Sequence, residues 1–239
     1  SIASYGGAVF AGENVYVHSA TFNGNYSEQK GGAIYAGYGV SITGNNGAVS
    51  FDSNSSGTNG GAIYSSGGNS TNVSISDATF SSNSASIGGA VYAKTDANIT
   101  GSYFSSNTAS GNGGAVMTGG VTSINYSLFN GNSAGAGANG GAVMANSSVN
   151  AYNSTFYANS AERGSAIYSD SGNSVLRFIT TTKNEGTSAQ TSVEQSAVRT
   201  SGSTTVFDSI ISGNLQSGGE VGYDFYVDGS VVADRAHFG

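Results

Sequence analysis

The stretch Gly88-Gly89-Ala90-Val91-Tyr92, followed by Phe104-Ser105-Ser106-Asn107, holds both short motifs that recur along this chain. The Gly-Gly-Ala-Val/Ile tetrad has six intact copies and one worn copy, with alanines at Ala8, Ala33, Ala62, Ala90, Ala115, Ala142 and Ala166. The Phe-x-x-Asn tetrad alternates with it and begins at Phe22, Phe51, Phe80, Phe104, Phe129 and Phe156. Self-similarity at a period of about 26 residues predicts a solenoid.

Composition fits a chain made mostly of short strands. The 239 residues include 38 glycines, no proline and no cysteine, and 37% are hydrophobic, which is more than a disordered linker requires. Proline cannot donate to a strand ladder, so its absence suits continuous sheet. The net charge is −7 and the 7 basic residues are scattered, so we expect no nucleic-acid partner. No apolar run is long enough for a membrane-spanning helix.

The repeat predicts an all-β parallel β-helix of about 8–9 rungs. The residue after each alanine is β-branched, and short β-branched segments bounded by Gly, Asn and Ser are typical of strands. Each unit offers two or three such strands, which coiling places about 4.8 Å from their counterparts in the next rung. We expect one β-helix over residues 1–239, regular over 1–170 and degenerate or capping over 171–239. Because Ser1 begins almost on a rung, we expect more solenoid before it.

The remaining motif positions are expected to form the corners. The glycine pairs permit tight or left-handed backbone at a bend that every rung makes. Asn25 and its equivalents are expected to occupy the left-handed region and to stack amide on amide along the axis. Variation in the period falls between these points, at residues 44–48 and 135–139, where we expect loops. Toward the C-terminus, Thr181 and Ile211 replace the phenylalanine, Val198 follows a degraded tetrad, and residues 224–227 suggest a last strand.

With both tetrads in view, the chain resembles the polymorphic outer membrane proteins of chlamydiae and related autotransporter passenger domains. Those proteins are defined by repeated GGA(I/L/V) and FxxN motifs, which here include GGAIY at 31–35 and FNGN at 22–25. The resemblance covers about residues 4–214 and implies a surface-exposed, right-handed β-helix, commonly part of an adhesin carried out by a C-terminal translocator barrel. The chain contains no such barrel and lacks the cysteines that some members carry.

The residue two after each alanine is the candidate binding face. We call this set the outer series; it comprises Phe10, Tyr35, Tyr64, Tyr92, Met117, Met144 and Tyr168. It alternates with the aliphatic residues, so it faces outward if those face inward, and Arg199 at the same offset favours that orientation. An exposed aromatic stripe suits a sugar, a protein partner or a neighbouring rod. The alternatives are that loops cover the stripe or that it belongs to the core.

The residue pattern gives little support for a catalytic site or a metal site. A polysaccharide-cleaving β-helix needs converging carboxylates, whereas Asp77 and Asp208 share one rung offset several rungs apart, and other acidic residues suit solvated turns. The segment 218–224 resembles a calcium-binding repeat but occurs once, so Asp224 and Asp228 are weak calcium candidates. We expect no cofactor and no catalytic residue.

We therefore expect a non-enzymatic protein of the bacterial cell surface or extracellular space, acting as an adhesin-like passenger or a structural rod. Its expected partners are a host-cell or matrix protein, a surface glycan, or copies of itself in a self-associating fibre. Two alternatives remain open: a polysaccharide-processing enzyme, and ice binding through ranks of threonine. Thr21, Thr79 and Thr155 share one position, but Tyr103 and Leu128 interrupt the rank.

Overall fold

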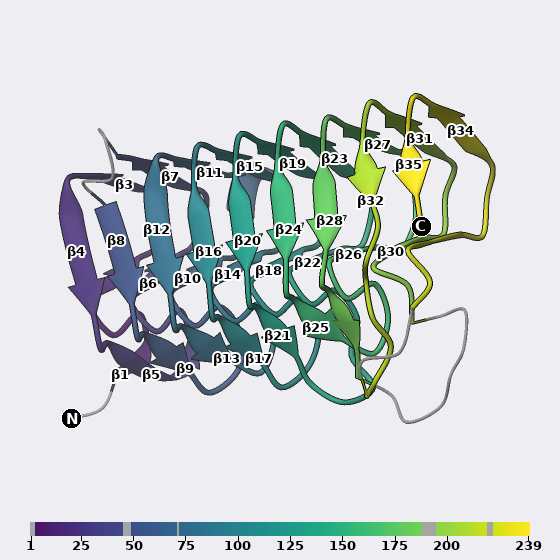
Figure 1. Cartoon of the computed structure of the whole chain (residues 1–239). Helices are drawn as coiled ribbons and strands as arrows, with labels where there is room; N and C mark the ends of the chain where they lie inside the picture. The colour runs from purple at the N-terminus through teal and green to yellow at the C-terminus, as the bar shows by residue number, and fades with distance from the viewer. Residues whose placement is uncertain (1–2, 45–48, 71, 188–194, 219–221) are drawn as a thin grey trace.

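The computed structural model describes residues 3–44, 49–70, 72–187, 195–218 and 222–239. The chain coils into a parallel β-solenoid of about 8 turns with a period of about 27 residues, as the motif spacing predicted. Each of the first eight turns contributes one strand to each of four parallel sheets, and the last turn contributes a described strand to three of them (Figure 1). No α-helix occurs among the described residues, and the one 3-10 turn is η1 (Gly68–Ser70).

Sheets A and B meet at the glycine tetrads. Sheet A consists of β1 (Ala3–Tyr5), β5 (Tyr26–Lys30), β9 (Ser55–Ser56), β13 (Ser84–Ala85), β17 (Thr108–Ala109), β21 (Ser133–Ala134), β25 (Ser160–Ala161) and β29 (Glu185–Gly186). Sheet B consists of β2 (Val9–Ala11), β6 (Ile34–Ala36), β10 (Ile63–Ser65), β14 (Val91–Ala93), β18 (Val116–Thr118), β22 (Val143–Ala145), β26 (Ile167–Ser169), β30 (Val198–Thr200) and β33 (Phe225–Val227).

Sheets C and D complete each turn. Sheet C consists of β3 (Val15–His18), β7 (Val40–Thr43), β11 (Val73–Ser76), β15 (Ala97–Thr100), β19 (Thr122–Asn125), β23 (Val149–Tyr152), β27 (Ser174–Arg177), β31 (Thr204–Phe207) and β34 (Val231–Asp234). Sheet D consists of β4 (Ala20–Asn23), β8 (Val49–Asp52), β12 (Ala78–Ser81), β16 (Tyr103–Ser105), β20 (Leu128–Asn130), β24 (Thr155–Tyr157), β28 (Thr180–Thr182), β32 (Ile210–Ile211) and β35 (His237–Phe238).

Four strands in each turn exceed the two or three that the sequence suggested. The strands of sheet A account for the difference, because most are two residues long and are built from Ser, Thr and Ala rather than β-branched aliphatic residues. Their interior side chains, such as Ser27 and Ala109, are small, so no hydrophobic pattern marks them. The segment 44–48 lies between sheets C and D, and residues 45–48 of that predicted loop are outside the described part of the chain.

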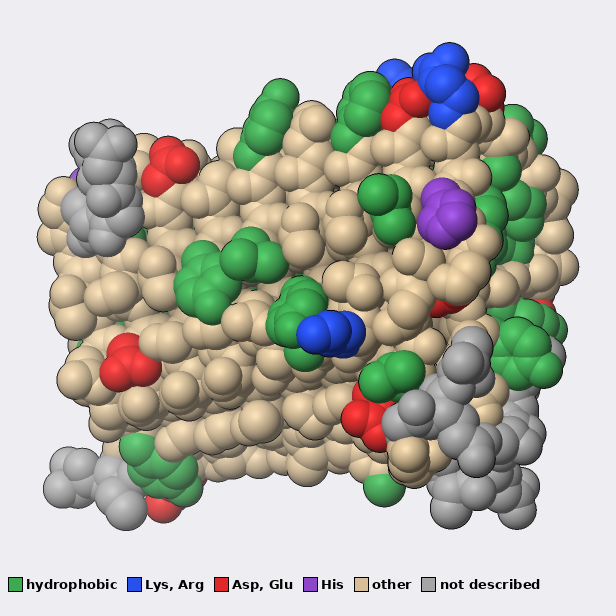
Figure 2. All heavy atoms as spheres, in the orientation of Figure 1, with side chains coloured by type: hydrophobic (Ala, Val, Ile, Leu, Met, Phe, Trp, Pro, Cys, Tyr) green, Lys and Arg blue, Asp and Glu red, His purple; other side chains and the backbone are tan. Residues whose placement is uncertain are grey.

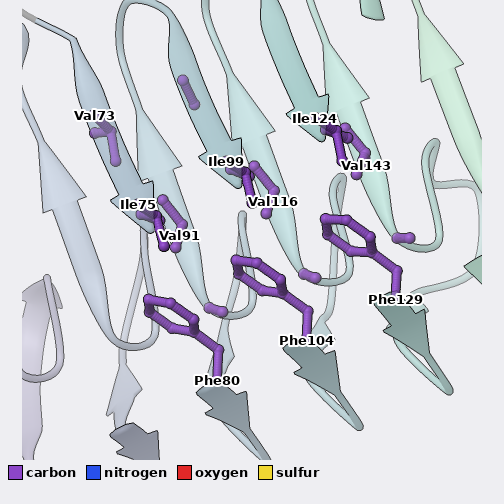
Figure 3. Packing of buried hydrophobic residues seen from close by; sticks show 14 of the residues in the cluster. Val73, Ile75, Phe80, Val91, Ile99, Phe104, Val116, Ile124, Phe129 and Val143 are labelled. Atoms are coloured by element: carbon purple, nitrogen blue, oxygen red, sulfur yellow. The ribbon is translucent and has the colours of Figure 1, made fainter. Parts of the chain in front are cut away.

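The core is a column of identical residues stacked turn on turn. Phe51, Phe80, Phe104, Phe129 and Phe156 are fully buried, and their rings stack at centroid distances of 4.7 to 5.1 Å. The aliphatic residues of sheets B and C pack against them, as Figure 3 shows for Val91, Ile99 and Val116. In the degenerate turns Thr181 and then Ile211 continue the phenylalanine column, and Val198 continues the aliphatic one, as predicted.

The predicted amide ladder runs beside the phenylalanine column. Each asparagine accepts at Oδ1 from both the backbone N–H and the side-chain amide of the asparagine one turn earlier, over distances of 2.8 to 3.1 Å. The ladder contains Asn25, Asn54, Asn83, Asn107, Asn132, Asn159, Asn184 and Asn214. It satisfies buried polar groups that would otherwise be costly inside the tube.

The predicted left-handed backbone at these asparagines is wrong by one residue. The positive φ angle belongs to the preceding residue, for example Ser53 at 55° and Ser106 at 53°. The asparagine must instead keep its amide aligned with the ladder, so the corner is made by its neighbour. At the other corner, Gly31 has φ +66°, while a Cβ on Gly32 would overlap the carbonyl oxygen of Gly61 one turn later. The first glycine of the pair is therefore required for its positive φ angle, and the second for the close approach of the next turn.

Candidate binding surfaces

The outer series lies on the outside of sheet B, while the aliphatic residues beside it face the core. Ile63, Val91 and Val116 belong to the central column, whereas Met117, Met144 and Tyr168 form a separate apolar cluster. The aromatic members stack on one another: Phe10 on Tyr35, Tyr35 on Tyr64 and Tyr64 on Tyr92, at 5.0 to 5.3 Å. The series is thus continuous in space, as parallel register requires.

Most of the outer series is covered rather than exposed. Phe10 is 63% exposed, but Tyr64, Met117, Met144 and Tyr168 are all below 9%, and Tyr35 and Tyr92 are half-buried. Access to this stripe is therefore concentrated at the first turn. Of the two orientations considered from the sequence, the residues point outward, and neighbouring side chains then close over them.

The covering side chains come from the position just before each glycine pair. Lys30 places its Nζ 4.7 Å from the centre of the Tyr64 ring, Ile87 packs on the methionine cluster, and Tyr5 contacts both Phe10 and Tyr35. Bridges between turns pair Lys30 with Asn59 and Asn59 with Ile87, so the position forms a row of its own. This row gives no residue-type signal in the sequence, because its members differ from turn to turn. Their constant offset from the glycines was the available signal.

The covered stripe perturbs two titratable groups. Burial raises the pKa of the Tyr92 hydroxyl above its ordinary value, because the ionised form would lose its hydration. For Lys30, desolvation lowers the pKa, but the hydrogen bond donated to the Tyr64 hydroxyl and the neighbouring tyrosines raise it overall. Both groups keep their protonated forms at neutral pH, so Lys30 places a positive charge over the Tyr64 ring, as Arg199 does over the Tyr168 ring.

The two calcium candidates have protein partners. Asp224 ends the amide ladder: its Oδ1 accepts from the Asn214 side chain at 2.6 Å, and its Oδ2 accepts from the backbone N–H of Gly239 at 3.1 Å. The Asp228 carboxylate lies 3.6 Å from the guanidinium of Arg199. Residues 219–221 of the glycine-rich segment are outside the described part of the chain. Within the described part, no three His, Asp or Glu side chains gather as metal ligands.

The other acidic candidates sit at corners, each with a local partner. Asp208 forms a bidentate pair with Arg235, whose hydrogen bonding holds the pKa of that carboxyl below its usual value. Asp77 occupies the equivalent corner several turns away and accepts from the Ser76 hydroxyl at 3.0 Å. The structure therefore does not bring these two carboxylates together.

An apolar cavity of about 490 Å³ lies at the C-terminal end of the tube. It is lined by Tyr223, Phe225, Val231 and Phe238, together with Gly222, Asp224 and Gly239. Phe225, Val231 and Phe238 are the last-turn counterparts of the interior residues Val198, Thr204 and Ile211. The cavity is thus the end of the core column. No described helix has the length and apolar character needed to cross a membrane.

Four segments match the Chlamydia polymorphic membrane protein repeat, over residues 19–37, 48–66, 77–94 and 101–119. The chain carries this repeat. Each match begins at the corner before sheet D, passes through sheets D and A, and ends with the strand of sheet B. The resemblance inferred from the two tetrads is confirmed, and the repeat indicates a protein of the outer membrane or cell surface. No curated protein and no solved structure matches the chain.

Proposed function

We propose that this chain is a non-enzymatic, adhesin-like passenger of the bacterial cell surface that binds through its lateral faces. The strongest support is that the recurring residues of the repeat all serve the corners or the interior of the solenoid. The glycines form the corners, the phenylalanines and aliphatic residues form the core, and the asparagines form the ladder. Side chains that differ from turn to turn are left on four long outer surfaces, where a partner would be recognised.

The choice of a binding role over an enzymatic one rests on the acidic residues. Asp208 and Asp228 are each paired with an arginine, and Asp224 serves the amide ladder. A glycan-cleaving site needs two free carboxylates facing one another across a substrate. The candidate partners are a host-cell or matrix protein, a surface glycan, or another copy of the chain.

The test is direct binding of the purified, labelled protein to cultured animal cells and to immobilised matrix proteins. Saturable binding that excess unlabelled protein displaces is the expected result. The proposal fails if the folded protein binds no cell or matrix surface. It also fails if the protein releases reducing sugar from polysaccharides and a single Asp or Glu substitution abolishes that release.

End-to-end association is the second candidate, and the apolar end cavity favours it. Phe225, Val231 and Phe238 would be covered if the first turn of another copy stacked on the last turn of this one. Sedimentation velocity over a range of concentrations distinguishes the two functions. Concentration-dependent growth that Phe238→Ser reduces would support a fibre, and a monomer at every concentration would remove it.

A further inference from the structure

In the middle turns, the exposed large hydrophobic side chains lie on one face of the solenoid. Between Ser27 and Gly218, the described residues include five large hydrophobic side chains that are exposed: Tyr126, Leu128, Tyr157, Phe178 and Ile210. All five lie on the outside of sheet D or in the turns that lead into it. Figure 2 shows this face, with hydrophobic groups across its middle and along its upper border. We call it the D face.

Two of these side chains occupy a backbone conformation that disfavours them. Tyr126 and Phe178 have φ angles of 50° and 55°, and they are 68% and 51% exposed. A bulky residue in the left-handed region is sterically unfavourable, and an exposed ring recovers little of this cost by packing. Asn153, which tolerates that conformation, holds the same position in the turn between them. Packing within the folded chain does not explain why large aromatic residues occupy these two positions.

The rings on the D face occur in two pairs, each separated by two turns. Tyr126 and Phe178 hold one position at the corner. Tyr103 precedes the phenylalanine of its strand and Tyr157 follows it, so this pair is also offset across the sheet. Two turns correspond to about 10 Å along the axis. The Tyr103 hydroxyl accepts a hydrogen bond from Asn130 at 3.2 Å, and the Lys183 ammonium lies 5.5 Å from the centre of the Tyr157 ring. These contacts restrain the orientation of both tyrosines.

The side chains between the rings are uncharged, and all except Leu128 are polar. From β12 to β28 the outward residues of sheet D are Thr79, Ser81, Tyr103, Ser105, Leu128, Asn130, Thr155, Tyr157, Thr180 and Thr182. Asp52 lies before this stretch and Lys183 after it. Arg177, which precedes Phe178, is exposed at the same end of the face. The cations thus lie at one end of the stretch, whereas a neutral partner rich in hydroxyl groups finds donors and acceptors throughout.

We propose that the D face binds a neutral glycan chain laid along the solenoid axis. The exposed rings would stack on the apolar faces of sugar units, and the Thr, Ser and Asn side chains would hydrogen-bond the hydroxyl groups between them. A protein partner fits less well, because its interface needs a contiguous apolar centre, whereas Asn153 and Thr155 separate these rings. The inference rests on the proposed adhesin-like function and names its face and its partner class.

The test uses substitutions that the chain already contains at the same register. Tyr103→Thr copies Thr79, Tyr157→Asn copies Asn130, and Tyr126→Asn and Phe178→Asn copy Asn153. The fourfold variant should therefore fold, which circular dichroism and thermal melting will verify. Tyr16→Ser is the matched control, because it removes a ring that is 70% exposed on sheet C and copies Ser41.

Both variants and the wild type are titrated against immobilised mannan, galactan, xylan and cellulose, with heparin as the anionic comparator. Loss of the four rings should weaken binding to the neutral polysaccharide at least about tenfold. The control should stay within about twofold of the wild type. Binding of wild type to none of the four neutral polysaccharides, binding to heparin alone, or undiminished binding by the fourfold variant would each overturn the inference.

Cell binding separates failure of this inference from failure of the proposed function. If the fourfold variant still binds cells as the wild type does, the adhesin-like role stands and the D face is not its site. If the variant loses cell binding but enzymatic removal of cell-surface glycans leaves wild-type binding unchanged, the D face recognises a protein and the glycan assignment is wrong. Loss of wild-type binding after that treatment, together with binding to a neutral polysaccharide, supports the inference.

Discussion

At the scale of single residues, the Phe-x-x-Asn tetrad owes its spacing to one hydrogen bond between turns. The side-chain amide of Asn107 donates to the backbone carbonyl of Phe80 one turn earlier, at 3.0 Å, and each ladder asparagine from Asn54 to Asn184 makes the equivalent bond. The second hydrogen of the same side-chain amide donates to Oδ1 of the asparagine one turn later, and so continues the amide ladder. A ladder that donates in one direction needs an acceptor at its last member, and Asp224 supplies it.

Replacing Asp224 should therefore affect folding stability in a graded way. Asp224→Ala leaves the buried amide of Asn214 without its acceptor and should lower the free energy of unfolding by about 1–3 kcal/mol. Asp224→Asn keeps an oxygen at that place and should cost less than half as much. Urea denaturation measures both. If calcium stabilises the wild type and neither variant, the carboxylate is a metal ligand and the ladder-capping interpretation is wrong.

At the scale of the elements, the corner between sheets A and B brings the backbones of neighbouring turns into close contact. A Cβ on Gly32 would overlap the carbonyl oxygens of Gly61 and Ser55, which are both backbone atoms of the next turn. Gly32→Ala should thus cost more than about 3 kcal/mol, since the turns cannot separate without breaking their hydrogen bonds. Gly12→Ala is the control, because a Cβ there meets nothing within 4 Å. Thermal melting of the two variants compares them, and equal melting temperatures would contradict the account.

Elements with a strong side-chain signature could be predicted from the sequence, and those without one could not. The strands of sheets B, C and D were visible because Val91, Ile99 and Phe104 recur in register. The two-residue strands of sheet A were missed, since Ser and Ala there carry no periodic signal. The outer series was recognised, but its burial depends on Lys30 and Ile87, which cross from a different sheet. The D face went unnoticed as a site because Tyr103 appeared only as an interruption of a threonine rank, and Tyr126, Tyr157 and Phe178 recur at no regular position of the repeat.

At the scale of the whole molecule, stability is the sum of contacts between neighbouring turns, because each turn packs only on the turns beside it. The middle turns have fully buried core residues in sheets B, C and D, such as Val116, Ile99 and Phe80. The last turn is different. All four residues of β34 are exposed, β33 is half-buried, and the end cavity opens beside them.

Amide hydrogen exchange of this 239-residue chain should therefore show a gradient along the axis. Amides of β11 to β24 should exchange slowest, with protection near that of global unfolding, and those of β33 to β35 should exchange at least about tenfold faster. The reason is local: opening the last turn exposes little buried apolar surface, whereas opening a middle turn breaks two sets of ladders. Exchange measured by mass spectrometry on peptic fragments resolves the turns. Equal protection from β11 to β35 would mean that the solenoid unfolds as one cooperative unit, and the nearest-neighbour account would then be wrong.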